Sequence, residues 1–202
     1  MFLLVAIGLV AIVIFAFTSP EGFWSNTITL INVVLAAMLA MNYFEPVAAF
    51  FDTGDMLASF TYLLDIIAIW AVFAIAFSLL RFVTDSISRT RVRFRMPVET
   101  IGNLVMCAAI AWVMVSFTMT TFHLAPLART PFQGAFQETP MANNLLGLAP
   151  DRMWLGFFQH RTRVALSASP VREFDPRGEF VYKYGTRRQQ FSEEPAMRVN
   201  KK

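Results

Sequence analysis

The sequence predicts an all-α membrane protein with four transmembrane helices, followed by a C-terminal tail outside the membrane that contains amphipathic helices. Hydrophobic residues make up 56% of the 202-residue chain and charged residues only 15%, whereas an average soluble domain has about 25% charged residues. Residues 1–80 contain no lysine or arginine, and twelve of the seventeen basic residues follow His123. These observations divide the chain into a membrane domain, residues 1–122, and a polar, basic tail, residues 123–202.

Four apolar stretches define the predicted spans, at residues 2–18, 26–51, 60–83 and 98–122. The first would reach roughly 24 Å as a helix, slightly short of a hydrocarbon core of about 30 Å. A chain in water would not bury all four stretches, whereas helices in lipid satisfy their own backbone hydrogen bonds. A cleaved signal peptide is the alternative for the first stretch, but the stretch lacks the basic n-region that a signal peptide needs.

The charges between the spans predict the orientation of the protein. Residues 81–97, here called the arginine loop, carry five arginines, while the loop after the second span carries Glu45, Asp52 and Asp55 and no base. Because basic loops stay in the cytoplasm, we expect the arginine loop to be cytoplasmic and the acidic loop to lie outside. Four spans then place the N-terminus and the tail outside as well.

Two amphipathic helices are expected in the tail. Asp151 would cap the first, which runs to about Leu166, and Asp175-Pro176 would begin the second, with proline at the first helical position. Aromatic and basic faces suit helices that lie in a membrane interface beside anionic lipid headgroups. Packing of the two helices on the membrane bundle or on each other is the equal alternative. The expected interface or partner contacts are Trp154, Phe158, Arg161, Arg163, Tyr184, Arg187 and Arg188. The second helix would carry Tyr184 on one side and Lys183, Arg187 and Arg188 on the other.

Polar side chains within spans are the usual pointers to function in a membrane protein. Asp65 lies roughly 8 Å below the outer end of its span; it suits a proton or cation site, but we favour pairing within the bundle. Asn32 and Asn103 fall near the cytoplasmic ends of their spans, where we expect hydrogen bonds between helices. The centres of the spans carry no charge, which argues against a monomeric carrier but leaves an oligomeric transporter or channel subunit open.

The sequence contains no motif for catalysis or for a cofactor. Neither His123 nor His160 has a partner at metal-ligand spacing, and nucleophile-elbow, P-loop and dinucleotide motifs are missing. We expect His123 at the membrane interface and His160 on the surface, and Cys107 as a packing residue in an apolar run. We therefore predict no enzymatic activity, no cofactor, no metal and no nucleic acid. The expected partners are the lipid bilayer, further copies of the chain and other envelope proteins.

Three segments resemble the colicin V production protein (CvpA) family of bacterial inner-membrane proteins. They are Gly22-Phe23 ahead of a second span that ends in Asn42-Tyr43-Phe44-Glu45-Pro46, a third span that closes on Arg81 before a basic loop, and Glu99-Thr100-Ile101-Gly102-Asn103 at the start of the fourth span. The resemblance covers about residues 1–122. The chain departs from the family in having no arginine beside the first-turn glycine, and Met106 where a second glycine often follows.

The resemblance implies a multi-pass protein of the bacterial inner membrane with no established catalytic residues. It also implies a link to toxin (colicin V) production or export and to maintenance of the envelope. Together with the apolar span centres and the basic, aromatic tail, it predicts a non-enzymatic membrane anchor or adaptor. A small oligomeric transporter or channel subunit is the alternative, in which Asp65 and the asparagines would line the path.

Overall fold

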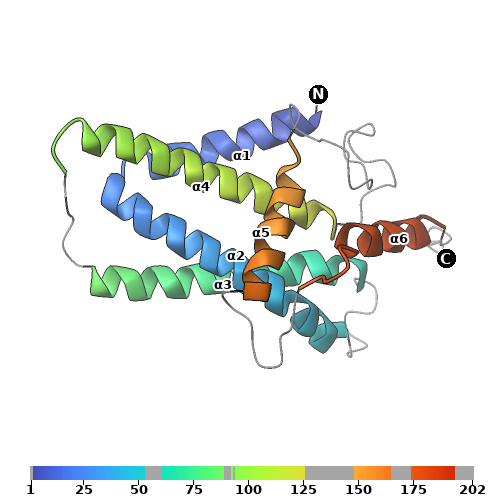
Figure 1. Ribbon diagram of the computed structural model, residues 1–202. Helices are drawn as coiled ribbons and strands as arrows, with labels where there is room; N and C mark the ends of the chain where they lie inside the picture. The colour runs from blue at the N-terminus through green and yellow to red at the C-terminus, as the bar shows by residue number, and fades with distance from the viewer. Residues whose placement is uncertain are drawn as a thin grey trace, which may run out of the picture.

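The protein is described by a computed structural model, which covers residues 2–52, 61–88, 92, 94–125, 148–164 and 174–193. Within these residues the fold is built from helices. The elements are α1 (Phe2–Thr18), α2 (Phe23–Asp52), α3 (Thr61–Ile87), α4 (Val98–Phe122), α5 (Pro150–Val164) and α6 (Phe180–Glu193). Figure 1 shows α1 to α4 running along one axis, with α5 crossing them near one end and α6 at that same end.

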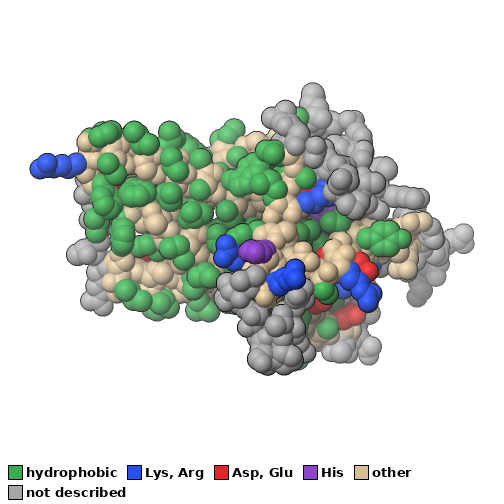
Figure 2. All heavy atoms as spheres, in the orientation of Figure 1, with side chains coloured by type: hydrophobic (Ala, Val, Ile, Leu, Met, Phe, Trp, Pro, Cys, Tyr) green, Lys and Arg blue, Asp and Glu red, His purple; other side chains and the backbone are tan. Residues whose placement is uncertain are grey.

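Among the residues that the structure describes, three helices are long and apolar enough to cross a membrane: α2, α3 from Leu63 onward, and α4. α1 is more apolar than these three helices but has only 17 residues, so it is shorter than they are. Apolar side chains cover the visible surface of the bundle over most of its length (Figure 2). The chain is therefore a helical protein with three membrane-spanning candidates and one shorter apolar helix beside them.

The observed boundaries agree with the predicted spans for α1 and α4, whereas α2 begins three residues before the predicted span and α3 ends four residues beyond it. The added part of α3 contains Asp85, which forms an ion pair 3.0 Å long with Arg81 one turn earlier. Such i,i+4 pairs stabilise helices. A span defined by apolar residues alone ends too early at this point.

The two ends of the bundle bring together segments that lie far apart in the sequence. At one end, here called the arginine-loop end, α1 and α3 finish and α2 and α4 begin. At the other, here called the tail end, α2 and α4 finish, α3 begins, and α5 and α6 are found (Figure 1). The tail and the arginine loop therefore lie at opposite ends of the bundle.

The core forms where α2 packs against α3 and α4. Ala36, Ala37 and Ala40 on α2 are fully buried, and such small side chains let neighbouring helices approach closely. Towards the tail end, the core continues through aromatic rings, with the centroids of Phe73 and Phe117 5.0 Å apart. α1 packs separately on α4.

Both tail helices begin differently from the predictions. α5 begins at Pro150, so Asp151 lies in its first turn and does not cap it. α6 begins at Phe180 and not at Pro176, because residues 175–178 form a turn in which Asp175 has a φ of 47°. The Asp175 carboxylate still acts as a cap, since it accepts hydrogen bonds from the backbone N–H groups of Glu179 (2.7 Å) and Phe180 (2.8 Å).

Candidate functional site

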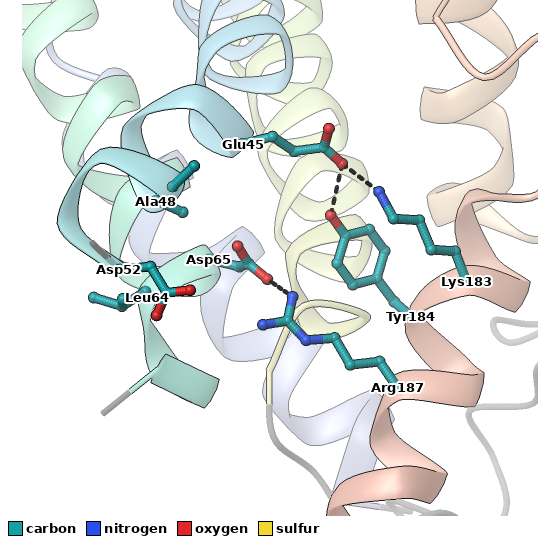
Figure 3. Close-up of a pocket in the computed structure, with 9 residues that line it drawn as sticks. Glu45, Ala48, Asp52, Leu64, Asp65, Lys183, Tyr184 and Arg187 are labelled. Carbon is teal, nitrogen blue, oxygen red and sulfur yellow. Dashed lines mark hydrogen bonds and ion pairs between the residues drawn. The ribbon is translucent and has the colours of Figure 1, made fainter. Parts of the chain in front are cut away.

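Two ion pairs fasten α6 to the tail end of the bundle. Arg187 on α6 pairs with Asp65 in the first turns of α3, and Lys183 Nζ lies 2.7 Å from Glu45 Oε1 on α2. The Tyr184 hydroxyl donates a hydrogen bond to the same Glu45 oxygen at 3.0 Å. Figure 3 shows the three side chains of α6 pointing toward the two carboxylates of the bundle.

A pocket of about 200 Å³ lies beside these contacts. Its lining comes from α2, α3 and α6: Glu45, Ala48, Ala49, Asp52, Leu64, Asp65, Lys183, Tyr184 and Arg187. Burial raises the pKa of Tyr184 above its ordinary value, and the negative charges of Glu45 and Asp65 raise it further. The phenol therefore keeps its proton and remains a hydrogen-bond donor to Glu45.

The local sequence of α6 explains why its aromatic and basic residues face the same way. Phe180, Tyr184 and Arg187 follow one another at spacings of four and three residues, which places them on one side of a helix. The Phe180 and Tyr184 rings are 4.8 Å apart, and Tyr184 also faces Phe44 of α2 at 6.4 Å. The prediction that Arg187 lies opposite Tyr184 is wrong, because both side chains reach the same acidic pocket.

A buried pair of titratable side chains joins α4 to α5. His123 Nε2 lies 2.9 Å from Asp151 Oδ2, and neither side chain has any exposed surface. Arg152 Nη1 lies 3.5 Å from the same carboxylate oxygen. Burial by itself raises the pKa of Asp151, but the hydrogen bond and charge of His123, together with the charge of Arg152, outweigh it and lower the pKa below its ordinary value.

The His123 imidazole is enclosed by protein, so this side chain, which was expected at the membrane interface, does not reach the surface of the protein. Sequence reasoning also missed its partnership with Asp151. The two residues lie 28 positions apart. In the sequence, His123 indicated only the end of a span, and Asp151 indicated only the start of a helix. No pattern in the sequence connected these two signals.

Two of the three aromatic residues of α5 form part of the core. Trp154 and Phe158 are buried, with the Trp154 ring 6.0 Å from Phe117 and the Phe158 ring 4.6 Å from Phe174. Of the two alternatives for these side chains, the structure therefore shows packing on the bundle. Arg161 and Arg163 are exposed, and the side chain of Arg188 lies outside the described residues.

At the arginine-loop end, buried amides tie the first turn to α4. Asn26 has no exposed surface, and its Nδ2 donates to the Thr18 carbonyl at 2.8 Å and to Asn103 Oδ1 at 2.6 Å. Asn103 Nδ2 in turn donates to the Ser19 carbonyl at 2.9 Å. Asn103 therefore forms the hydrogen bonds between segments that were expected of it, whereas Asn26 was missed, although it stands at the start of an apolar stretch.

Glu99 and Gly102 hold α4 against the start of α2. The Glu99 carboxylate accepts backbone N–H bonds from Phe23 and Phe94, each 3.0 Å long. Gly22 has a φ of 93°, a conformation that favours glycine. A Cβ atom on Gly102 would lie 2.7 to 3.0 Å from the Phe23 ring, so the close approach of the two helices depends on this glycine.

Arg81 connects three elements at the same end. Its guanidinium lies 3.0 Å from both Glu21 and Asp85, and it donates to Thr29 Oγ1 at 2.5 Å. Beside it, Asn32 Nδ2 donates to Thr84 Oγ1 of α3 at 2.9 Å. These contacts lock the last turns of α3 onto α2.

The arrangement of these groups suits structural fastening better than chemistry. Among the described residues, no three His, Cys, Asp or Glu side chains come together as metal ligands would. Cys107 is buried and accepts a contact from Asn26 at 3.3 Å. The polar groups instead form ion pairs and hydrogen bonds that join segments distant in the sequence at the two ends of the bundle.

Comparison with known proteins finds no matching family model, no similar curated protein and no similar solved structure.

Proposed function

We propose that this chain is a non-enzymatic membrane anchor or adaptor, whose helical bundle holds a folded, basic tail at one face of a membrane. The observation that carries the proposal is the attachment of α6 to the bundle through two ion pairs, Asp65 with Arg187 and Glu45 with Lys183. A tail fixed in this way presents a defined surface, whereas a tail tethered only by its chain would not.

The proposed membrane arrangement has four spans, with the arginine loop in the cytoplasm and the tail outside. α1 supports a fourth span because its 17 residues reach the lower limit for crossing a bilayer. It also lies along α4, packed through Ile7 against Val115 and Met119. The position of the tail and the arginine loop at opposite ends of the bundle is consistent with this arrangement (Figure 1).

The proposed location is the bacterial inner membrane, and the proposed role is that implied by the resemblance to the CvpA family. That role is linked to toxin (colicin V) production or export and to maintenance of the envelope. The close contact between Gly102 and Phe23 and the two backbone bonds to Glu99 support the resemblance, since these residues belong to the segments that carry it.

The interior of the bundle supports an anchor over a carrier. The middle thirds of α2, α3 and α4 carry no charged residue, and the side chains buried there include Ala37, Ala40, Phe73 and Ile110. A carrier normally has ionisable groups or broken helices at this depth. The pocket beside Asp65 is the feature that favours the second candidate, an oligomeric transporter or channel subunit, because it places acidic groups at one mouth of the bundle.

Photo-crosslinking in cells tests the proposal. A photoreactive residue at Tyr182, which is exposed on α6, should capture the same envelope protein in repeated experiments. The same residue at Trp154, which is buried, should capture only the chain itself and serves as the matched control.

A measurement of ion flux across reconstituted vesicles distinguishes the anchor from the second candidate, the oligomeric transporter or channel subunit. We expect no passage of protons or potassium ions above that of empty vesicles. Flux that disappears in the Asp65→Asn variant would overturn the anchor proposal and favour an oligomeric transporter.

A further inference from the structure

α5 crosses the spans near the end of α4 (Figure 1). Its Trp154 packs on Phe117 of α4, and Phe117 lies nineteen residues beyond Val98, the first residue of α4. At about 1.5 Å per residue, this separation is roughly 28 Å. The hydrocarbon core of a bilayer is about 30 Å thick. The arginine loop ends at the start of α4, so along this helix α5 sits about one hydrocarbon thickness from the end of the loop.

The outward face of α5 combines apolar and basic side chains. Met153, Phe157, His160, Arg161 and Arg163 are exposed, while Trp154 and Phe158 are buried. The Arg161 guanidinium lies over the Phe157 ring, 5.4 Å from its centroid. A helix that lies in a membrane interface characteristically carries aromatic and basic side chains in this combination.

The surroundings of α5 change character from one side to the other. In Figure 2 the basic side chains over α5 lie between the apolar surface of the bundle and the region at the tail end where acidic side chains appear. A boundary of this kind, with apolar surface on one side and charge on the other, is expected where a membrane protein leaves the hydrocarbon layer. Arginine can place its stem against apolar surface while its charged head reaches the headgroups.

We propose that the outward face of α5 binds anionic phospholipids in the leaflet on the tail side, with Arg161 and Arg163 at the lipid phosphates and Phe157 and Met153 in the upper acyl layer. Guanidinium groups bind phosphate oxygens through paired, charge-assisted hydrogen bonds. Of the residues expected at the interface, Arg161 and Arg163 thus bind the lipid phosphates, while Trp154 and Phe158 hold α5 on the bundle. Met153 and Phe157 complete the surface.

This proposal rests on the membrane placement in the proposed function, and a depth measurement tests the two separately. The full chain, in a Cys107→Ala background, receives one nitroxide label at Phe157→Cys, Tyr182→Cys or Ile75→Cys and is reconstituted in vesicles of phosphatidylcholine and phosphatidylglycerol. Tyr182 is exposed on α6, and Ile75 is exposed at the middle of α3. Relaxation by oxygen reports the lipid phase, and relaxation by a water-soluble nickel complex reports the aqueous phase.

We expect the label at Ile75 to lie deep in the lipid, the label at Phe157 to lie just below the phosphates, and the label at Tyr182 to lie in water. If the labels at Phe157 and Tyr182 are equally accessible to nickel while that at Ile75 is not, the site on α5 is refuted and the membrane placement stands. If all three are in water, the membrane placement itself fails.

The lipid class is tested by titrating the purified full chain with phosphatidylglycerol or phosphatidylcholine and counting bound lipids by native mass spectrometry. Loss of one basic group at an anionic surface corresponds to roughly fivefold weaker binding. Arg161→Gln should therefore weaken binding of phosphatidylglycerol about fivefold, while Arg161→Lys, which keeps the charge but not the paired hydrogen bonds, should weaken it less.

The matched control is Arg177→Gln, which removes one positive charge from an exposed side chain that faces Glu179 in the turn before α6. Its affinity for phosphatidylglycerol should equal that of the unchanged chain. Unchanged binding in Arg161→Gln, or equal weakening in Arg177→Gln, would overturn the proposal, because the lipid would then respond to net charge or bind elsewhere.

Discussion

The Arg187→Gln substitution should release α6 from the bundle while leaving the membrane helices folded. Glutamine keeps most of the side-chain length but removes the charge that faces Asp65. The Asp65 carboxylate would then remain at the pocket without its cation. Since the ring contacts of Phe180 and Tyr184 and the ion pair of Lys183 persist, the expected change is local opening of α6 and not loss of the fold.

The burial of the two ion pairs sets the expected magnitude. The side chains of Asp65 and Arg187 are 11% and 35% exposed, between a fully buried pair, where losing one partner costs about 3–5 kcal/mol, and an exposed pair, worth about 0.2–1 kcal/mol. We therefore expect a cost of about 2 kcal/mol, or roughly thirtyfold in the opening equilibrium of α6. Lys183 and Glu45 are 61% and 53% exposed, so Lys183→Gln should change this equilibrium less than about fivefold.

Hydrogen exchange of the backbone N–H groups of α6, followed by mass spectrometry in lipid nanodiscs, measures this opening. Exchange in α6 should quicken about thirtyfold in Arg187→Gln, with exchange in α4 unchanged. In an Asp65→Asn background, the same substitution should add little, because the interaction is already lost. Equal effects of Arg187→Gln and Lys183→Gln, or an effect of Arg187→Gln below fivefold, would refute the reasoning from burial.

Three further predictions follow from the same structure. Gly102→Ala should lower the melting temperature and cost about 1–3 kcal/mol, because its Cβ would press on the Phe23 ring, whereas Gly8→Ala, with open space around its Cβ, should be neutral or slightly stabilising. The pKa of Asp151 is lowered in the folded protein, so the ionised carboxylate stabilises the fold fully at pH values above the ordinary pKa of 3.8. This stabilisation disappears as the pH falls through the lower pKa of the folded state. The melting temperature of the Asp151→Asn variant should therefore depend less on acid pH than that of the unchanged chain. Alkaline phosphatase fused at Lys202 should be active and a fusion within the arginine loop inactive; the reverse pattern would contradict the proposed orientation.

The membrane helices could be predicted from the sequence because apolar length is a local property. The predicted fourth span, residues 98–122, coincides with α4, since Pro97 precedes it and His123 follows the last apolar residue. The end of α3 was placed too early, because Arg81 and Asp85 stabilise a helical turn by pairing with each other. Polarity alone therefore underestimates the length of a helix whose last turns contain an ion pair between neighbouring side chains.

The attachment of the tail could not be predicted because its partners lie far away in the sequence. Arg187 pairs with a residue 122 positions earlier, and Lys183 with one 138 positions earlier. A helix with arginine, lysine and aromatic residues suits an anionic lipid surface and an acidic protein pocket equally well. Only the fold decides between them, by bringing Glu45 and Asp65 to one mouth of the bundle.

The division of the chain at residue 122 describes polarity and not packing. Trp154 and Phe158 of α5 and Tyr184 of α6 belong to the same buried cluster as Phe44 and Phe117 of the membrane helices. Without the tail, Phe44 would lose its contact with Tyr184, Phe117 would lose its contact with Trp154, and the Asp65 carboxylate would lose its cation. Because α5 and α6 complete the core at this end, the bundle fixes their position. An adaptor that presents one defined surface needs its tail to be held in a fixed position in this way.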